Sequence, residues 1–312
     1  PDGDSPNLGY AHRVVWLRLP VRATAASDWL LEVGYPSLDR VELFIPGAQG
    51  YTRLEAGDLA PFAARPYPHR NLVFPLPLPA GESTLYLRVQ SEGNLTLPLT
   101  LWTPEAFHRA NPGLYAILAL YYGSFLALGL YNLLLFFSLR DRVYLEYVLF
   151  VTAMAIGQAS LNGFGNQFLW PGWPAWGNLA LPVGFALTGL FGALFTRSFL
   201  ATRASVPRLD RLLLFFVAWF LVALAAGLVS YRWLAMLTSL GGIGFSIVAW
   251  IAGLACLRRG SRGARFFLLA WSIMLVGVAV MAARNFGWLP TNFLTTYAMQ
   301  IGSALEMLLL SF

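Results

Sequence analysis

The sequence contains no lysine, and this absence excludes two common classes of site. A nucleotide-binding P-loop and a retinal-bound opsin both depend on a lysine side chain. Cys256 is the single cysteine, so no disulfide can form within the chain. All three histidines precede residue 110, and neither HExxH nor GxSxG occurs. We therefore expect no enzymatic activity, no metal and no cofactor in this chain.

Charged residues are also scarce, at 12% of the chain against about 25% in soluble domains. The scarcity lies after residue 113. Residues 1–113 hold nine arginines and eleven acidic residues, whereas residues 114–312 hold twelve arginines and four acidic residues. The net charges are therefore −2 and +8. Because the positive excess belongs to loops between apolar runs, it does not indicate nucleic-acid binding.

Long apolar runs occupy the chain after residue 113. About 20 apolar residues cross a bilayer core as a helix, and the backbone must satisfy its own hydrogen bonds there. A soluble helical core is the alternative, but its helices would carry a polar face. The pattern predicts a membrane bundle of seven transmembrane helices within a domain of residues 111–312. The seven runs are 114–137, 144–161, 179–199, 212–229, 233–257, 266–286 and 293–312.

Residues 1–110 show a different pattern, in which apolar and polar side chains alternate in short runs separated by Gly, Pro, Asp and Ser. This period of two indicates β-strands, and the even spacing favours an antiparallel sandwich. Pro75 and Pro98 should lie at sheet edges or bulges. The predicted strands are 13–21, 29–33, 40–45, 71–76, 84–90 and 94–102.

The distribution of arginine predicts the orientation in the membrane. Ten arginines lie in the loops after runs one, three and five or at the ends of these runs, whereas two lie in the corresponding places of runs two, four and six. Cytoplasmic loops are enriched in Lys and Arg, so the β domain should lie outside and the end of the chain inside. Three tryptophans in residues 170–176 (WPGWPAW) suggest a loop at the outer membrane surface that contacts the β domain.

The best candidates for ligand contact lie in the Pro-rich loop 64–70 (ARPYPHR). They are Tyr67, His69 and Arg70, because loop side chains need not serve the core. An exposed aromatic ring with a polar edge can stack on a ligand such as a sugar. The alternatives are core packing for the aromatic residues of this domain and an ordinary loop histidine for His69.

A few polar side chains interrupt the apolar runs, where they are costly and usually face the bundle interior. Asn132 and Glu306 lie at similar depths near the inner end, so they could meet inside the bundle. The alternative is that each pairs separately. We assign a signalling role to Asn132, Glu146 and Glu306, while Gln158, Arg284 and Gln300 are the other polar residues of the runs.

Several of these stretches together resemble one family, the bacterial seven-transmembrane receptors with diverse intracellular signalling modules (7TMR-DISM). In the apolar region they are 121–123 (YYG), 131–136 (YNLLLF), 140–145 (RDRVYL) and 303–311 (SALEMLLLS). Before it, stretches 16–18 (WLR), 39–43 (DRVEL), 69–74 (HRNLVF) and 96–99 (TLPL) resemble part of the family's type-2 extracellular domain. The resemblance implies a jelly-roll-like external domain that binds carbohydrate, an inner-membrane location, and a cytoplasmic diguanylate cyclase or histidine kinase as output.

The leading interpretation is a sensory receptor that binds a small ligand in the periplasm and relays a signal through its helices. The alternative is a transporter or channel, which usually shows paired repeats and charges near the bilayer midplane. The end of the chain carries no helix stop signal. We therefore expect the seventh helix to continue into a cytoplasmic output domain in cis, through a dimeric coiled coil. The expected partners are membrane lipid, the ligand, this output domain and a second copy of the chain.

Overall fold

The computed structural model describes residues 14–312, apart from 48–49, 94, 286–288, 290–292 and 311–312. The chain divides into two compact units. The first contains the β-strands, the described residues from 14 to 116 and residues 158–181. The second contains residues 117–157 and 182–312, which are helical for most of their length. The sequence-based boundary between residues 110 and 111 stays a prediction.

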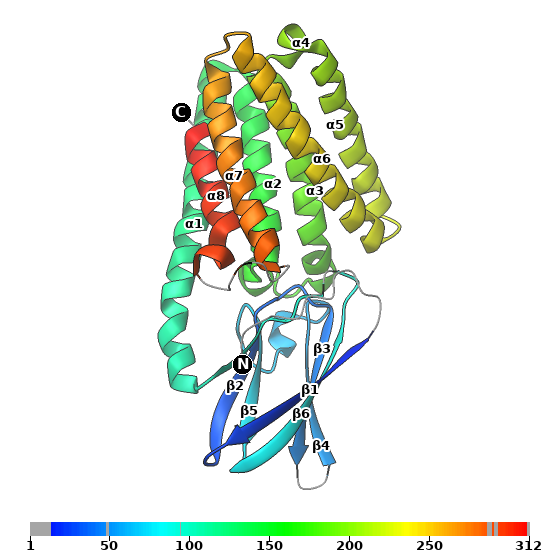
Figure 1. Ribbon diagram of the computed structural model, residues 1–312, viewed down its shortest axis with the longest axis vertical. Coiled ribbons are helices and arrows are strands. Elements are labelled where there is room, and N and C mark those ends of the chain that lie inside the picture. The colour runs from blue at the N-terminus through cyan, green and yellow to red at the C-terminus, as the bar shows by residue number, and fades with distance from the viewer. Residues whose placement is uncertain (1–13, 48–49, 94, 286–288, 290–292, 311–312) are drawn as a thin grey trace. The chain divides into compact units, whose positions relative to one another are not determined.

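Two antiparallel sheets form the N-terminal domain (Figure 1). One has the strand order β1-β6-β3-β4, and the other has the order β5-β2-β7. The strands are β1 (Val15–Ala23), β2 (Ser27–Val33), β3 (Arg40–Gly47), β4 (Gly50–Ala56), β5 (Leu72–Leu78), β6 (Gly81–Gln90) and β7 (Leu99–Trp102). Five predicted strands correspond to β1, β2, β3, β5 and β6, the predicted strand 94–102 is confirmed over Leu99–Trp102, and β4 was missed. A jelly roll has eight strands, so the seven described strands do not establish that topology.

Alternation of side chains explains the core of this domain. Inward residues from both sheets, including Val33, Leu43, Phe74 and Leu87, are buried and pack into one hydrophobic cluster. The edge strand β4 has exposed residues along most of its length, which removes the apolar signal that would have predicted it. Pro75 lies in β5, which is an edge strand of its sheet, as predicted.

Six helices within the described residues are long and apolar enough to cross a membrane. They are α1 (Pro104–Leu139), α2 (Arg142–Leu161), α3 (Pro174–Phe199), α5 (Pro207–Gly227), α6 (Tyr231–Arg258) and α7 (Gly263–Asn285), of which Gly263–Val280 is the apolar span. Six of the seven predicted runs therefore form helices that are long and apolar enough to be spans. Two shorter elements, η2 (Gly165–Leu169) and α4 (Thr202–Ser205), lie in the connections.

The seventh predicted span corresponds to α8 (Phe293–Leu310), whose stretch Tyr297–Leu310 is apolar but shorter than the six. In Figure 1, α8 (red) lies beside α7 (orange). The Tyr121 hydroxyl of α1 lies 2.8 Å from the Ser303 hydroxyl of α8, and the Tyr147 hydroxyl of α2 donates to the Met307 carbonyl at 2.9 Å. These contacts make α8 part of the bundle, while a full count of seven spans stays a prediction.

Candidate functional site

Residues 158–181 run from the last turn of α2 through η2 to the first two turns of α3, and we call them the α2–α3 segment. Hydrogen bonds join it to loops of the β-sandwich within one compact unit. The Phe62 N–H donates to the Pro171 carbonyl at 3.0 Å, and Arg70 Nη1 donates to the Asn162 carbonyl at 3.2 Å. The predicted contact between residues 170–176 and the β domain is therefore confirmed.

Two carboxylates meet at one end of the β3–β4 hairpin. Asp39 immediately precedes β3, and Asp58 follows β4 by one residue. Because Val41 lies opposite Ala56 in the antiparallel register, continuing that register places the two aspartates opposite each other. The Asp58 N–H donates to the Leu38 carbonyl at 2.9 Å, which holds this end of the hairpin closed.

Asn178, in the second turn of α3, donates its side-chain amide to both aspartates. Its Nδ2 lies 3.2 Å from Asp39 Oδ1 and 3.2 Å from Asp58 Oδ1. Asp39 also accepts hydrogen bonds from the Glu92 N–H at 2.8 Å and the Ser91 hydroxyl at 3.3 Å. One amide of the α2–α3 segment thus bridges two acidic groups of the β domain.

Burial changes the acidity of these groups. It raises the pKa of the Asp58 carboxyl to about 7, and the nearby charge of Asp39 acts in the same direction. Burial also raises the pKa of Asp39, against the lowering effect of its hydrogen bond from Glu92. Asp58 is only 4% exposed, so an uncompensated negative charge there is costly. The pair can therefore take up a proton near neutral pH.

Arg65 supplies a positive charge that acts on Asp58. Its side chain is buried, and Nη1 donates to the carbonyls of His69 at 2.8 Å and Arg70 at 2.9 Å. Burial lowers its pKa to about 10, while attraction to Asp58 opposes that shift. A pKa of about 10 keeps the guanidinium charged at neutral pH. Arg65 thus links the acidic pair to the loop that carries the predicted ligand residues.

Gly163 allows a close approach between the α2–α3 segment and the loop that contains Arg70. Its φ is +70°, a left-handed conformation that glycine adopts without strain. A Cβ at this position would lie 2.3 Å from the Arg70 carbonyl oxygen. A side chain on residue 163 would therefore push the α2–α3 segment away from the loop containing Arg70.

The structure brings Tyr67, His69 and Arg70 together around the start of α1, but it does not expose them equally. Tyr67 is half-buried, and its hydroxyl lies 3.4 Å from Nε2 of the exposed His108. His69 and Arg70 are buried, at 3% and 8% exposure. The expectation of exposed loop side chains was wrong for these two residues, because the loop is covered by α1 and by the α2–α3 segment. A ligand-binding role for the three residues stays a prediction.

His69 is held as a neutral side chain. Its ring packs against Phe107 at 5.0 Å and Tyr115 at 5.8 Å, and Nδ1 accepts a hydrogen bond from the Asn71 N–H at 3.2 Å. Burial, together with the nearby charge of Arg70, lowers the pKa of His69 to about 4. His69 therefore supports the loop by packing rather than as a cation.

Sequence reasoning missed Asp39, Asp58, Arg65 and Asn178 as site residues. The two aspartates could have been found from the sequence. A residue just before the first strand of an antiparallel hairpin lies opposite a residue just after the second strand. No comparable signal existed for Asn178, which lies 120 residues after Asp58. Among the described residues, no group of three or more acidic, histidine or cysteine side chains could hold a metal.

The predicted intramembrane residues lie in the helical unit. Asn132 and Glu306 are buried, at 2% and 0% exposure, and Asn132 Nδ2 donates to the Leu128 carbonyl of its own helix at 2.9 Å. Glu146 is half-buried and accepts a hydrogen bond from Ser198. A contact between Asn132 and Glu306, and a signalling role for the three, stay predictions.

Comparison with protein-family models gives two matches. Residues 114–312 match the family described as 7TM diverse intracellular signalling. Residues 1–103 match the family described as 7TMR-DISM extracellular 2. No curated protein and no solved structure matches the chain.

Proposed function

Because the chain belongs to the 7TM diverse intracellular signalling family, we propose that it is a sensory receptor whose external β domain controls the helices through the α2–α3 segment. The family and its extracellular-2 domain indicate a membrane sensory receptor with an extracellular part followed by apolar helices. More specifically, we propose that the protein is a receptor of the bacterial inner membrane, with its β domain in the periplasm and its C-terminal side in the cytoplasm.

The observation that carries this proposal is the bridge from Asn178 to Asp39 and Asp58. A receptor needs a physical connection by which a change in its sensing domain biases a second element. Here the second element is the start of α3, whose remaining residues continue as an apolar helix. A change in the loops of the β domain would alter the bridge and with it the position of α3.

For the ligand, we propose a small molecule of the carbohydrate class. Tyr67 is the member of the predicted trio that retains exposed surface, and exposed His108 beside it adds a polar edge. Stacking with hydrogen bonds at the ring edge suits sugars. A ligand there would lie on the loop whose carbonyls Arg65 holds, and Arg65 is attracted to Asp58.

For the output, we propose a cytoplasmic effector of the diguanylate cyclase or histidine kinase type, driven in a homodimer. Asn132, Glu146 and Glu306 would adjust the packing of the helices that transmit the change. Interhelical hydrogen bonds in membranes average about 0.6 kcal/mol, which suits a switch between two packings of similar stability.

A saccharide panel tests this function on the purified full chain in detergent. We expect at least one saccharide to raise the apparent Tm and to alter hydrogen exchange in residues 158–181. The same saccharide should not accumulate inside proteoliposomes that contain the protein. Saturable accumulation would instead identify a transporter, and a panel without any effect on Tm would reject carbohydrate as the ligand class.

A further inference from the structure

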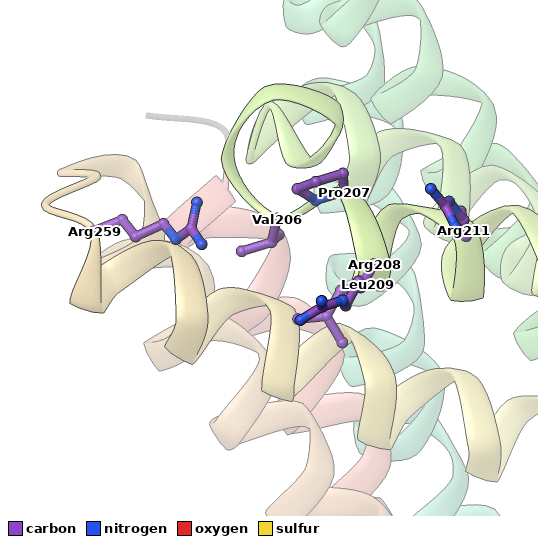
Figure 2. A pocket seen from close by; sticks show the side chains of 6 residues that line it. All are labelled: Val206, Pro207, Arg208, Leu209, Arg211 and Arg259. Carbon is purple, nitrogen blue, oxygen red and sulfur yellow. The ribbon is translucent and has the colours of Figure 1, made fainter.

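A pocket lies in the helical unit, at the end of the bundle where α5 begins and α6 ends. Its cavity of about 530 Å³ is lined by Val206, Pro207, Arg208, Leu209, Arg211 and Arg259. This volume falls within the range of roughly 300–1,000 Å³ that is typical of small-molecule sites. Figure 2 shows the Arg259 side chain extending from the end of α6 towards Val206, with Arg208 and Leu209 on the first turn of α5.

Half of the lining residues are arginines, and no acidic residue is among them. Arg208 and Arg211 lie three residues apart on α5, so they are neighbours on the helix surface. Among the described residues, no ion pair joins Arg208, Arg211 or Arg259 to a carboxylate. Arg259 Nη1 donates to the Ser205 carbonyl, which holds the guanidinium over the turn before α5.

The acidic residue nearest in sequence is already engaged elsewhere. Asp210 is buried, and it accepts hydrogen bonds from Arg197 Nε at 2.9 Å and Arg197 Nη2 at 3.1 Å. The Thr202 hydroxyl donates to the same carboxylate at 2.6 Å. Because Arg197 neutralises Asp210, the three pocket arginines keep an uncompensated positive charge.

The backbone adds to this preference for anions. α5 starts at Pro207, and its N-cap residue Val206 provides no side-chain hydrogen bond. The N-terminus of a helix carries partial positive charge and attracts anions. The guanidinium group of arginine also matches the oxygens of a phosphate in a two-point geometry. Val206, Pro207 and Leu209 supply an apolar wall beside these donors.

From these observations we propose that this pocket binds a phosphate-bearing anion, either the headgroup of an anionic membrane lipid or a free phosphate compound. The proposal goes beyond the receptor function, because it does not depend on the ligand of the β domain. Basic pockets between transmembrane helices are suited to anionic headgroups. Bound there, the anion would cross-link α5 to α6 at this end of the bundle.

The test uses the purified full chain and two probes, phosphatidylglycerol and inorganic phosphate. Native mass spectrometry measures how many phosphatidylglycerol molecules are retained relative to phosphatidylcholine, and calorimetry measures phosphate binding. The pocket variant is Arg208→Gln/Arg211→Gln/Arg259→Gln. The matched control is Arg140→Gln/Arg262→Gln/Arg265→Gln, which removes the same charge from exposed arginines outside the pocket.

We expect the wild type to prefer phosphatidylglycerol and the pocket variant to lose at least about tenfold in affinity, while the control changes by less than about twofold. Phosphatidylglycerol binding without phosphate binding identifies a lipid headgroup as the ligand. Displacement of the lipid by inorganic phosphate would show that the site also binds free phosphate compounds. Both results support the anion site.

Equal losses in the two triple variants would overturn the proposal, because they would show only a diffuse effect of surface charge. A wild type that binds neither probe would overturn it as well. If the triple variant does not purify as a single species, Arg211→Gln gives the same comparison against Arg265→Gln. Both are exposed arginines, so neither change removes a buried contact.

Discussion

Asp58 lies opposite Asp39 at the end of the β3–β4 hairpin, and the two carboxylates share the side-chain amide of Asn178. Like charges in a buried place repel, so the pair is stable only while a proton, an amide or a guanidinium compensates it. This relationship makes the contact between the β domain and the α2–α3 segment sensitive to single substitutions and to pH.

Asp58→Asn should flatten the pH dependence of stability. The pKa of Asp58 is about 7 in the folded protein, well above its ordinary value near 4 in an unfolded chain. The folded state therefore binds more protons between about pH 4 and pH 7, and stability falls as pH rises through this window. Each pKa unit of difference corresponds to about 1.4 kcal/mol.

The measurement for this prediction is the apparent Tm of the full chain at pH 5, 6, 7 and 8. The wild type should lose stability across the series, whereas Asp58→Asn should gain relative to it as pH rises. Asp28→Asn, which changes an exposed carboxyl of β2, is the control. Identical pH profiles for the wild type and Asp58→Asn would refute a proton-linked role for Asp58.

Substitutions of Asn178 should destabilise the protein by an amount that depends on the charge of the new side chain. Asn178→Ala removes the amide and leaves the buried Asp58 and the half-buried Asp39 without their shared donor, at a cost of about 1–3 kcal/mol. Asn178→Asp should cost more, because it adds a third negative charge, and it should recover partly at low pH. Thermal unfolding at pH 5.5 and 8 checks whether stability falls in the order wild type, Asn178→Ala, Asn178→Asp. An aspartate variant as stable as the wild type at pH 8 would contradict the bridge.

Gly163→Ala should destabilise the contact between the β domain and the α2–α3 segment. The new Cβ would lie 2.3 Å from the Arg70 carbonyl oxygen, and residue 163 would be held at φ +70°. We expect a loss of at least about 1 kcal/mol. Gly172→Ala is the matched control in the same segment, since a Cβ there meets no atom within 4 Å. Limited proteolysis within residues 158–181 should accelerate for Gly163→Ala alone.

The orientation is tested by single cysteines at Pro171 and Ser205. Cys256 is the single native cysteine and is buried, so it should give little background. An impermeant thiol reagent applied to intact cells should label a cysteine at residue 171 and not one at residue 205, as the arginine distribution predicts. The reverse pattern of labelling would invert the proposed topology.

Most of the fold could be predicted from the sequence, because the alternation of side chains in strands and the length of apolar runs are local properties of the chain. Alternation predicted six strands, and apolar length predicted the six helices that can span a membrane. The strand β4 escaped because its exposed edge position leaves no apolar alternation. Loop membership suggested exposed side chains at His69 and Arg70, but a segment about 90 residues later covers them. The Asn178 bridge was unpredictable, since long-range contacts between polar residues leave no period in one sequence.

The most direct test of the account is hydrogen exchange of the full chain, measured peptide by peptide for the wild type and for Asn178→Ala. The account predicts faster exchange in residues 36–42, 57–70 and 158–181 of the variant, with residues 207–258 unchanged. Gly172→Ala should behave as the wild type. Faster exchange confined to residues 158–181, with the β-domain loops unaffected, would show that the Asn178 bridge does not couple the two parts, and it would contradict the proposed route of signalling.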